Sequence, residues 1–270
     1  MTKDELHQIR KQRWPVLGQG GLPAFLAAAG YATLVPDAPW EVPALENLAP
    51  PEAAALLPAE IEAGIRARAI CEVHVFGPPL VYMPAELFVD AYLCRAGRLP
   101  SARRGREAGA GRAAQPPQLT GISPLAAAIA ELLWAGPPLS ASGLRTAIGP
   151  QRTSTLAILA AGRELARELQ ILRIGGSPAD PLWAPVVSAL PETHGALEQT
   201  SRDRAAAALI SKYLWLMAAA TEDDIAGFFG PLFSSGRLRG LLHALSTAGV
   251  IHAAEIDGRS AFALAAAETV

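Results

Sequence analysis

The sequence predicts a mainly α-helical protein with small β-hairpins, an α+β fold built from tandem winged helix-turn-helix units. Composition is the first observation: hydrophobic residues make up 51% of the 270 residues, many of them alanine, and aromatic residues only 6%. Alanine favours helices because it loses no side-chain entropy when a helix forms. The second observation is that the C-terminal half repeats one pattern of helix starts, helix ends and a hairpin.

The first copy of this pattern lies between residues 119 and 195. Ser123-Pro124 places a capping serine before a proline at the first helical position, and Gly149-Pro150 closes the second helix. The expected elements are helices that start at Ser123-Pro124, at Ser140 and near Thr153, and strands over 169–174 and 182–187. Three helices followed by two strands is the order of a winged helix.

The second copy lies between residues 196 and 270. Its expected elements are helices over 201–217, from Thr221, and from Ser234 or Ser235, then strands over 250–256 and 261–264 joined by Asp257-Gly258. The two copies align at an offset of 81 residues at Ser140 and Thr221, at Leu144 and Ile225, and at Gly149-Pro150 and Gly230-Pro231. Two copies of the pattern in register support the winged-helix prediction more strongly than one copy would.

The first 97 residues predict a divergent winged-helix-like domain. Thr2 and Glu5 form a capping-box pattern at the start of a helix that runs toward Arg13. The remaining expected elements are helices over 22–29, 51–57, 59–69 and 85–95, and strands at 31–35, 73–75 and 80–83. We therefore expect domains at 1–97, 119–195 and 196–270, joined between the first two by a linker at 98–118.

The charge is unevenly distributed along the chain. The formal net charge is −2, but residues 95–170 hold 10 basic and 4 acidic side chains. A polyanion responds to such a local concentration of positive charge. The Arg-, Gly- and Pro-rich linker supplies much of it, either as a cationic arm for phosphates or as a solvated loop.

Other functional classes receive little support from the sequence. Cys71 and Cys94 are too few for a disulfide framework, and the histidine spacing suggests no metal site. Cys71 and His74 lie on an alternating strand that places them on opposite faces, which indicates a buried thiol and a hydrogen-bonded histidine. The charged start and the lack of a long apolar run predict a cytoplasmic protein, and we expect no cofactor.

Several segments resemble the AlkZ/YcaQ-type DNA glycosylases. Residues 213–230 and 238–250 resemble the last winged helix of that family, and residues 138–149 resemble the middle one. Residues 30–36 and 41–46 are similar to a divergent branch. The resemblance implies three winged helices followed by a β-barrel. The chain ends shortly after the third wing, so we expect no C-terminal barrel.

The resemblance also implies a catalytic signature of a glutamine, a hydrophobic residue, and a glutamine or aspartate, which activates water at the sugar–base bond. The matching positions are Thr33, Leu34 and Val35. Valine cannot orient water or accept a proton, and threonine is a poor base. Asp37 and Glu41 are the substitutes that a shifted register allows, so Thr33, Asp37 and Glu41 are the catalytic candidates.

For DNA binding, the fold requires cations on the third helices, the wings or the flanking loops. The candidates are Arg98, Arg103, Arg104, Arg106 and Arg112 in the linker, Arg152, Arg163 and Arg167 on the third helix of the first copy, and Arg237, Arg239, His243 and Arg259 in the second copy. The leading hypothesis is a protein that binds duplex or damaged DNA without the usual catalytic motif. The alternatives are an active glycosylase for alkylated or crosslinked bases, and a winged-helix protein whose wings meet a protein partner.

Overall fold

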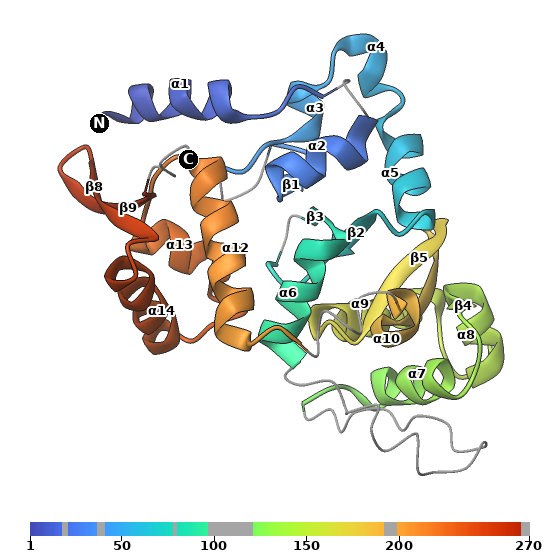
Figure 1. The fold of residues 1–270 in the computed structure, drawn as a ribbon. Coiled ribbons are helices and arrows are strands. Elements are labelled where there is room, and N and C mark those ends of the chain that lie inside the picture. The colour runs from blue at the N-terminus through green and yellow to red at the C-terminus, as the bar shows by residue number, and fades with distance from the viewer. Residues whose placement is uncertain (18–20, 37–40, 78–79, 97–120, 192–198, 266–270) are drawn as a thin grey trace.

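The computed structural model describes residues 1–17, 21–36, 41–77, 80–96, 121–191 and 199–265. Within these ranges the strands form three antiparallel sheets of three strands each (Figure 1). All three sheets have the same order, β1-β3-β2, β4-β6-β5 and β7-β9-β8, so the last strand in the chain always lies in the middle. The predicted α+β fold with small hairpins and repeated units is confirmed.

The N-terminal unit surrounds the first sheet. Its elements are α2 (Gly21–Ala29), β1 (Ala32–Thr33), α3 (Leu45–Leu48), α4 (Pro51–Ala54), α5 (Leu57–Arg66), β2 (Ile70–Val73), β3 (Val81–Pro84) and α6 (Ala85–Ala96). Helix α5 buries Ile61 and Ile65, which lie four residues apart on one face. Helix α1 (Lys3–Arg13) precedes the unit and begins with the predicted capping box of Thr2 and Glu5.

The middle unit surrounds the second sheet and has a core of its own. Its elements are α7 (Pro124–Ala135), β4 (Leu139–Ser140), α8 (Ala141–Ile148), α9 (Thr155–Arg167), β5 (Ile171–Ser177), β6 (Asp180–Pro185) and α10 (Val186–Ala189). Ser123 and Ser140 cap α7 and α8 as predicted, and Ser154 caps α9. Each of the three hydroxyls accepts a hydrogen bond from a backbone N–H that the helix leaves unpaired.

The C-terminal unit repeats this arrangement. Its elements are α12 (Arg202–Met217), β7 (Ala220–Thr221), α13 (Glu222–Phe229), α14 (Ser235–Thr247), β8 (Ile251–Ile256) and β9 (Arg259–Leu264). Thr221 caps α13 with a capping box, and Ser234 rather than Ser235 caps α14. The hairpin turn at Asp257-Gly258 has positive φ at both residues, as an Asp-Gly hairpin turn requires.

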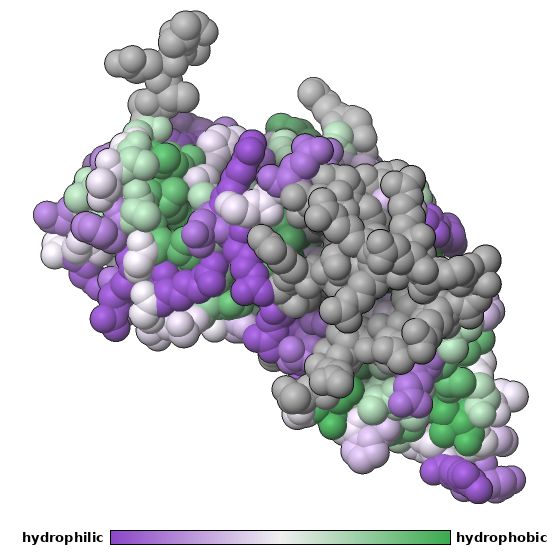
Figure 2. Space-filling view, turned by 60° about the horizontal axis from the view of Figure 1, so that its bottom comes forward, coloured by the Kyte–Doolittle hydropathy of each residue, from purple (hydrophilic) through white to green (hydrophobic). Residues whose placement is uncertain are grey.

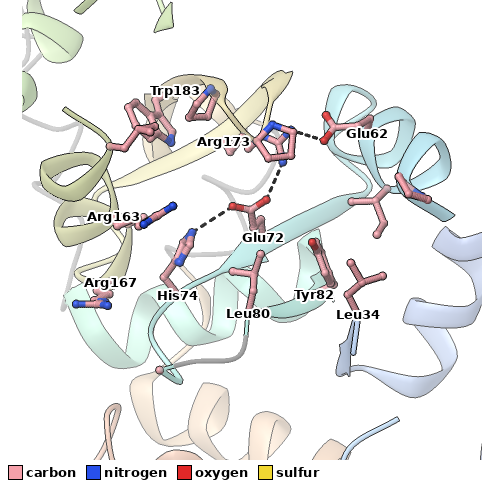
Figure 3. A pocket seen from close by; sticks show the side chains of 17 residues that line it. Leu34, Glu62, Glu72, His74, Leu80, Tyr82, Arg163, Arg167, Arg173 and Trp183 are labelled. Atoms are coloured by element: carbon pink, nitrogen blue, oxygen red, sulfur yellow. Dashed lines mark hydrogen bonds and ion pairs between the residues drawn. The ribbon is translucent and has the colours of Figure 1, made fainter. Parts of the chain in front are cut away.

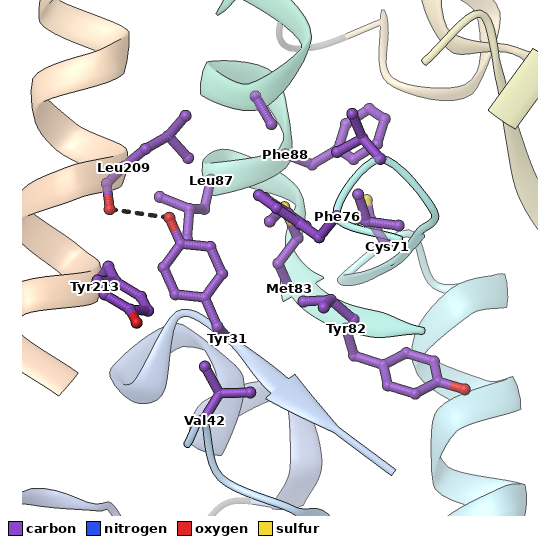
Figure 4. Packing of buried hydrophobic residues seen from close by; sticks show 14 of the residues in the cluster. Tyr31, Val42, Cys71, Phe76, Tyr82, Met83, Leu87, Phe88, Leu209 and Tyr213 are labelled. Carbon is purple, nitrogen blue, oxygen red and sulfur yellow. Dashed lines mark hydrogen bonds between the residues drawn. The ribbon is translucent and has the colours of Figure 1, made fainter. Parts of the chain in front are cut away.

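The N-terminal and C-terminal units share one hydrophobic core, to which β5, β6 and α10 of the middle unit also contribute. The hydroxyl of Tyr31 donates a 3.0 Å hydrogen bond to the carbonyl oxygen of Leu209 on α12 (Figure 4). The ring of Phe228 stacks on Phe76 at 4.5 Å and on Tyr213 at 4.9 Å between ring centroids. These contacts join the first and last units more closely than their positions in the sequence suggest.

Strands β4 and β7 go beyond the sequence prediction. Strands β4 and β7 contain two residues each and pair with the central strand of their sheets, so each hairpin gains a third strand. The predicted domain boundaries fall in or beside residues 97–120 and 192–198, outside the described ranges, and stay a prediction.

On the face in Figure 2, hydrophobic residues lie in separate groups between hydrophilic side chains. No helix of the described segments is long and apolar enough to cross a membrane.

Candidate functional site

A cavity of about 610 Å³ lies between the N-terminal and middle units (Figure 3). Helix α5 and strands β2 and β3 form one side, and α9, β5 and β6 form the other. Its polar and aromatic lining includes Glu62, Glu72, His74, Tyr82, Arg173 and Trp183. This volume falls within the range of about 300–1,000 Å³ that is typical of small-ligand sites.

Arg173 of β5 connects two carboxylates of the N-terminal unit. Its guanidinium donates at 2.8 Å to Glu72 and also forms a short ion pair with Glu62. It donates in addition to the carbonyl oxygen of Gly176 at 2.7 Å. Burial by itself lowers the pKa of Arg173, but the hydrogen bonds to the two carboxylates outweigh burial and raise this pKa. The arginine therefore stays charged and holds both carboxylates in place.

Glu72 and His74 point to the same side because they are two residues apart, as in a strand. The imidazole Nε2 of His74 lies 3.1 Å from a carboxylate oxygen of Glu72. Burial raises the pKa of Glu72, but hydrogen bonds from His74 and Arg173 more than offset this effect, so the pKa lies below its usual value. Glu72 is thus an anion at neutral pH. Cys71 is buried on the other face, where burial raises the pKa of its thiol.

Helix α9 contributes two cations to the cavity. Arg163 and Arg167 are exposed and line the wall that faces His74 (Figure 3). The neighbouring glutamates have other partners, since Glu164 accepts hydrogen bonds from Ser123 and Glu168 pairs with Arg95. Among the described residues, neither arginine has an ion-pair partner. Their positive charge is therefore available to a ligand.

The cations of the C-terminal unit are arranged differently. The ion pairs are Arg237 with Asp203 at 3.1 Å, Arg239 with Glu222 at 3.2 Å and Arg259 with Asp223 at 2.9 Å. His243 is exposed on α14. Acidic neighbours therefore reduce the positive field of this unit. The structure does not bring these side chains together with those of α9.

The remaining DNA-binding candidates lie elsewhere. Arg152 is exposed in the turn before α9, because that helix begins at Thr155 and not at Thr153. The linker arginines, Arg98, Arg103, Arg104, Arg106 and Arg112, lie outside the described residues.

Thr33 and Glu41, the two catalytic candidates that the structure describes, lie in different surroundings. Thr33 is fully buried, and its hydroxyl donates to the carbonyl oxygen of Val35 at 2.9 Å. Glu41 pairs with Arg10 and lines a second cavity of about 580 Å³ beside α1 and α13. Asp37 lies outside the described residues. Leu34, between the two positions that match the catalytic signature, lines the cavity of Glu62 and Glu72.

Glu62, Glu72 and Arg173 were not predicted from the sequence, and His74 was expected only as a hydrogen-bonded structural residue. Two patterns would have indicated them. Glu72 and His74 occupy one face of a short strand, and Arg173 interrupts an otherwise apolar strand at Ile171-Leu172-Arg173-Ile174. A charged residue in a buried strand requires a partner of opposite charge. Among the described residues, no three His, Cys, Asp or Glu side chains form a group that could hold a metal ion.

Comparison with known proteins identifies the family. A family model described as DNA glycosylase AlkZ-like matches residues 50–269. This chain belongs to the AlkZ-like DNA glycosylase family. No curated protein matches it in sequence. Among solved structures, the Streptomyces sahachiroi DNA glycosylase AlkZ resembles it with a TM-score of 0.59 and 15% identity, over 98% of this chain and 70% of that one. At this identity the likeness establishes the AlkZ-like fold.

Proposed function

We propose that this protein binds duplex DNA along α9 and the mouth of the cavity between the N-terminal and middle units, and that an unstacked nucleotide enters this cavity. Membership of a DNA glycosylase family and the likeness to a DNA glycosylase support the choice of DNA as the partner. The recognised DNA is a duplex whose target base leaves the stack easily, as a damaged base does.

The observation that carries this proposal is the pair of α9 arginines, which have no ion-pair partner within the described part of the chain. Arg163 and Arg167 occupy successive turns of the third helix of a unit with winged-helix topology. Arginine side chains at such positions bind phosphates and hold the duplex in one register. Arg237 and Arg239, near the start of α14, are already paired with carboxylates, so α9 is the stronger binding element.

The lining of the cavity suits a nucleotide. Tyr82 and Trp183 provide aromatic surface against which a base can pack, and Leu34 provides an apolar contact. Carboxylates accept hydrogen bonds from the N–H groups on the edge of a base. The phosphate-binding cations of α9 and the base-binding groups therefore line the same cavity.

Fluorescence anisotropy with a labelled duplex tests the proposal. We expect the Arg163→Gln/Arg167→Gln variant to bind roughly tenfold more weakly at low salt and to lose about 1.8 from the slope of log K against log salt, since each phosphate contact contributes about 0.9. The matched control is Arg237→Gln/Arg239→Gln, which removes the same charge from α14 and should change the slope less. An equal effect of both variants would contradict the role assigned to α9.

A protein partner on the wings is the outcome indicated if the wild-type protein does not bind duplex DNA at low salt. The second candidate function is base excision, and the buried carboxylates of the cavity are the observation that favours it. A cytoplasmic location stays a prediction.

A further inference from the structure

Glu62 has one carboxylate oxygen engaged and one free. Its Oε1 accepts from Arg173, whereas its Oε2 is buried and has no hydrogen-bond partner among the described residues. A buried carboxylate oxygen without a donor is unfavourable, because it loses its hydration and gains nothing in return. Glu62 lines the cavity, so a molecule in the cavity can supply this donor.

The net charge of Glu62 and its two neighbours, Glu72 and Arg173, indicates which sign of charge they stabilise in a bound molecule. Glu62, Glu72 and Arg173 together carry a formal net charge of −1, and their side chains are 22%, 13% and 5% exposed. Hydrolysis of a glycosidic bond passes through a transition state in which the sugar gains positive charge. A preorganised anion in a site with little water stabilises such a charge more strongly than water does.

The arginines of α9 are placed to bind the phosphates of a nucleotide. Arg163 and Arg167 lie at α9, across the cavity from Glu62 and Glu72, and form no ion pair with either carboxylate, so they can meet phosphates (Figure 3). Leu34 borders the same cavity, so the carboxylates lie in the cavity that the family's catalytic signature would border, although they come from α5 and β2.

We infer that Glu62 is the water-activating catalytic residue for hydrolysis of the N-glycosidic bond of a nucleotide in DNA, in place of the absent signature at Thr33 and Val35. This inference rests on the proposed binding of DNA. Arg173 and Glu72 are positioning residues, because Arg173 fixes Glu62 and Glu72 fixes Arg173.

The step balances without a cofactor. The oxygen of a water molecule forms a bond to C1′ of the sugar, the bond between C1′ and the base nitrogen breaks, and its electron pair stays with the base. The proton of the water passes to Oε2 of Glu62 and then to solvent. A base that carries a positive charge from alkylation departs as a neutral molecule and needs no proton.

Single-turnover base release tests the inference. The probe is a duplex that contains methylated purines, with released base separated by chromatography and duplex affinity measured on the same samples. We expect Glu62→Gln to release base at least about 100-fold more slowly while it binds the duplex as tightly as the wild-type protein or more tightly. The matched control is Glu60→Gln on the same helix, outside the cavity lining, with an unchanged rate.

The possible results separate the role of Glu62 from the proposed DNA binding. Wild-type protein that binds duplex but releases no base overturns the role of Glu62 and leaves the proposed DNA binding intact, and a wild-type rate in Glu62→Gln overturns it as well. Wild-type protein that does not bind duplex overturns the proposed function. If Glu62→Gln does not fold, Glu62→Asp keeps the charge but withdraws the carboxylate, and we expect a loss of at least about tenfold. A wild-type rate in a folded Glu62→Asp variant overturns the inference.

Discussion

Arg173 and Glu72 lie 101 residues apart in the sequence, yet their side chains are joined by a 2.8 Å hydrogen bond. This contact connects strand β5 of the middle unit to strand β2 of the N-terminal unit at the cavity (Figure 3). The same guanidinium also holds Glu62 of α5. One arginine therefore fixes both the geometry of the site and the relative position of two units.

We expect the Arg173→Met variant to be less stable by about 3–5 kcal/mol, because it leaves two largely buried carboxylates without their partner. Urea unfolding followed by circular dichroism measures this loss. The matched control is Arg163→Met, whose side chain is exposed, with an expected change within about 0.5 kcal/mol. A loss in Arg173→Met as small as that of the control would show that the ion pairs contribute little.

Gly162 of α9 lies directly under Trp183, so we expect Gly162→Ala to destabilise the protein by about 1–3 kcal/mol. A Cβ atom at Gly162 would overlap the indole of Trp183, so the ring or the helix would have to shift. Gly240→Ala on α14 is the control, because a Cβ there meets nothing within 4 Å and should stabilise the helix by about 0.5–1 kcal/mol. Thermal unfolding compares the two, and equal signs would contradict the packing described.

We expect the stability of the protein to depend on pH because of Asp90 of α6. Burial raises the pKa of its carboxyl to about 6, while the nearby Arg204 opposes this shift. The folded protein thus binds the proton more tightly than the unfolded chain, whose aspartates have a pKa of about 3.9. The resulting stabilisation is present below that value and is lost as the pH rises to about 6.

We therefore expect the Asp90→Asn variant to gain stability relative to the wild-type protein as the pH increases from about 4 to about 6. Urea unfolding of both proteins across this range measures the difference. A constant difference across the range would refute the shift in the pKa of Asp90.

The basic linker gives a prediction that involves residues outside the described segments. We expect Arg103→Glu, Arg104→Glu and Arg106→Glu in one chain to weaken duplex binding to a similar extent for all sequences, because phosphate contacts carry no base information. Anisotropy with two unrelated duplexes measures this loss. Unchanged affinity for both would exclude the linker from DNA binding.

The sequence by itself determined the elements whose causes are local. The caps at Thr2, Ser123, Ser140 and Thr221 lie where they were expected, because a capping side chain acts on a backbone N–H within three residues. Leu238, Leu241, Leu242 and Leu245 are all buried on α14, because the helical period places them on one face. The repeat then indicated the order of the winged helix.

Only the tertiary structure decided which side chains meet. Strands β4 and β7 are two residues long, too short for any alternation, and exist because a neighbouring strand pairs with them. Both α9 and α14 carry two arginines, but those of α14 have ion-pair partners and those of α9 have none among the described residues. The cavity joins Glu62 to Arg173, 111 residues later. Pairing at that separation depends on how packed units approach one another, and no local pattern records it.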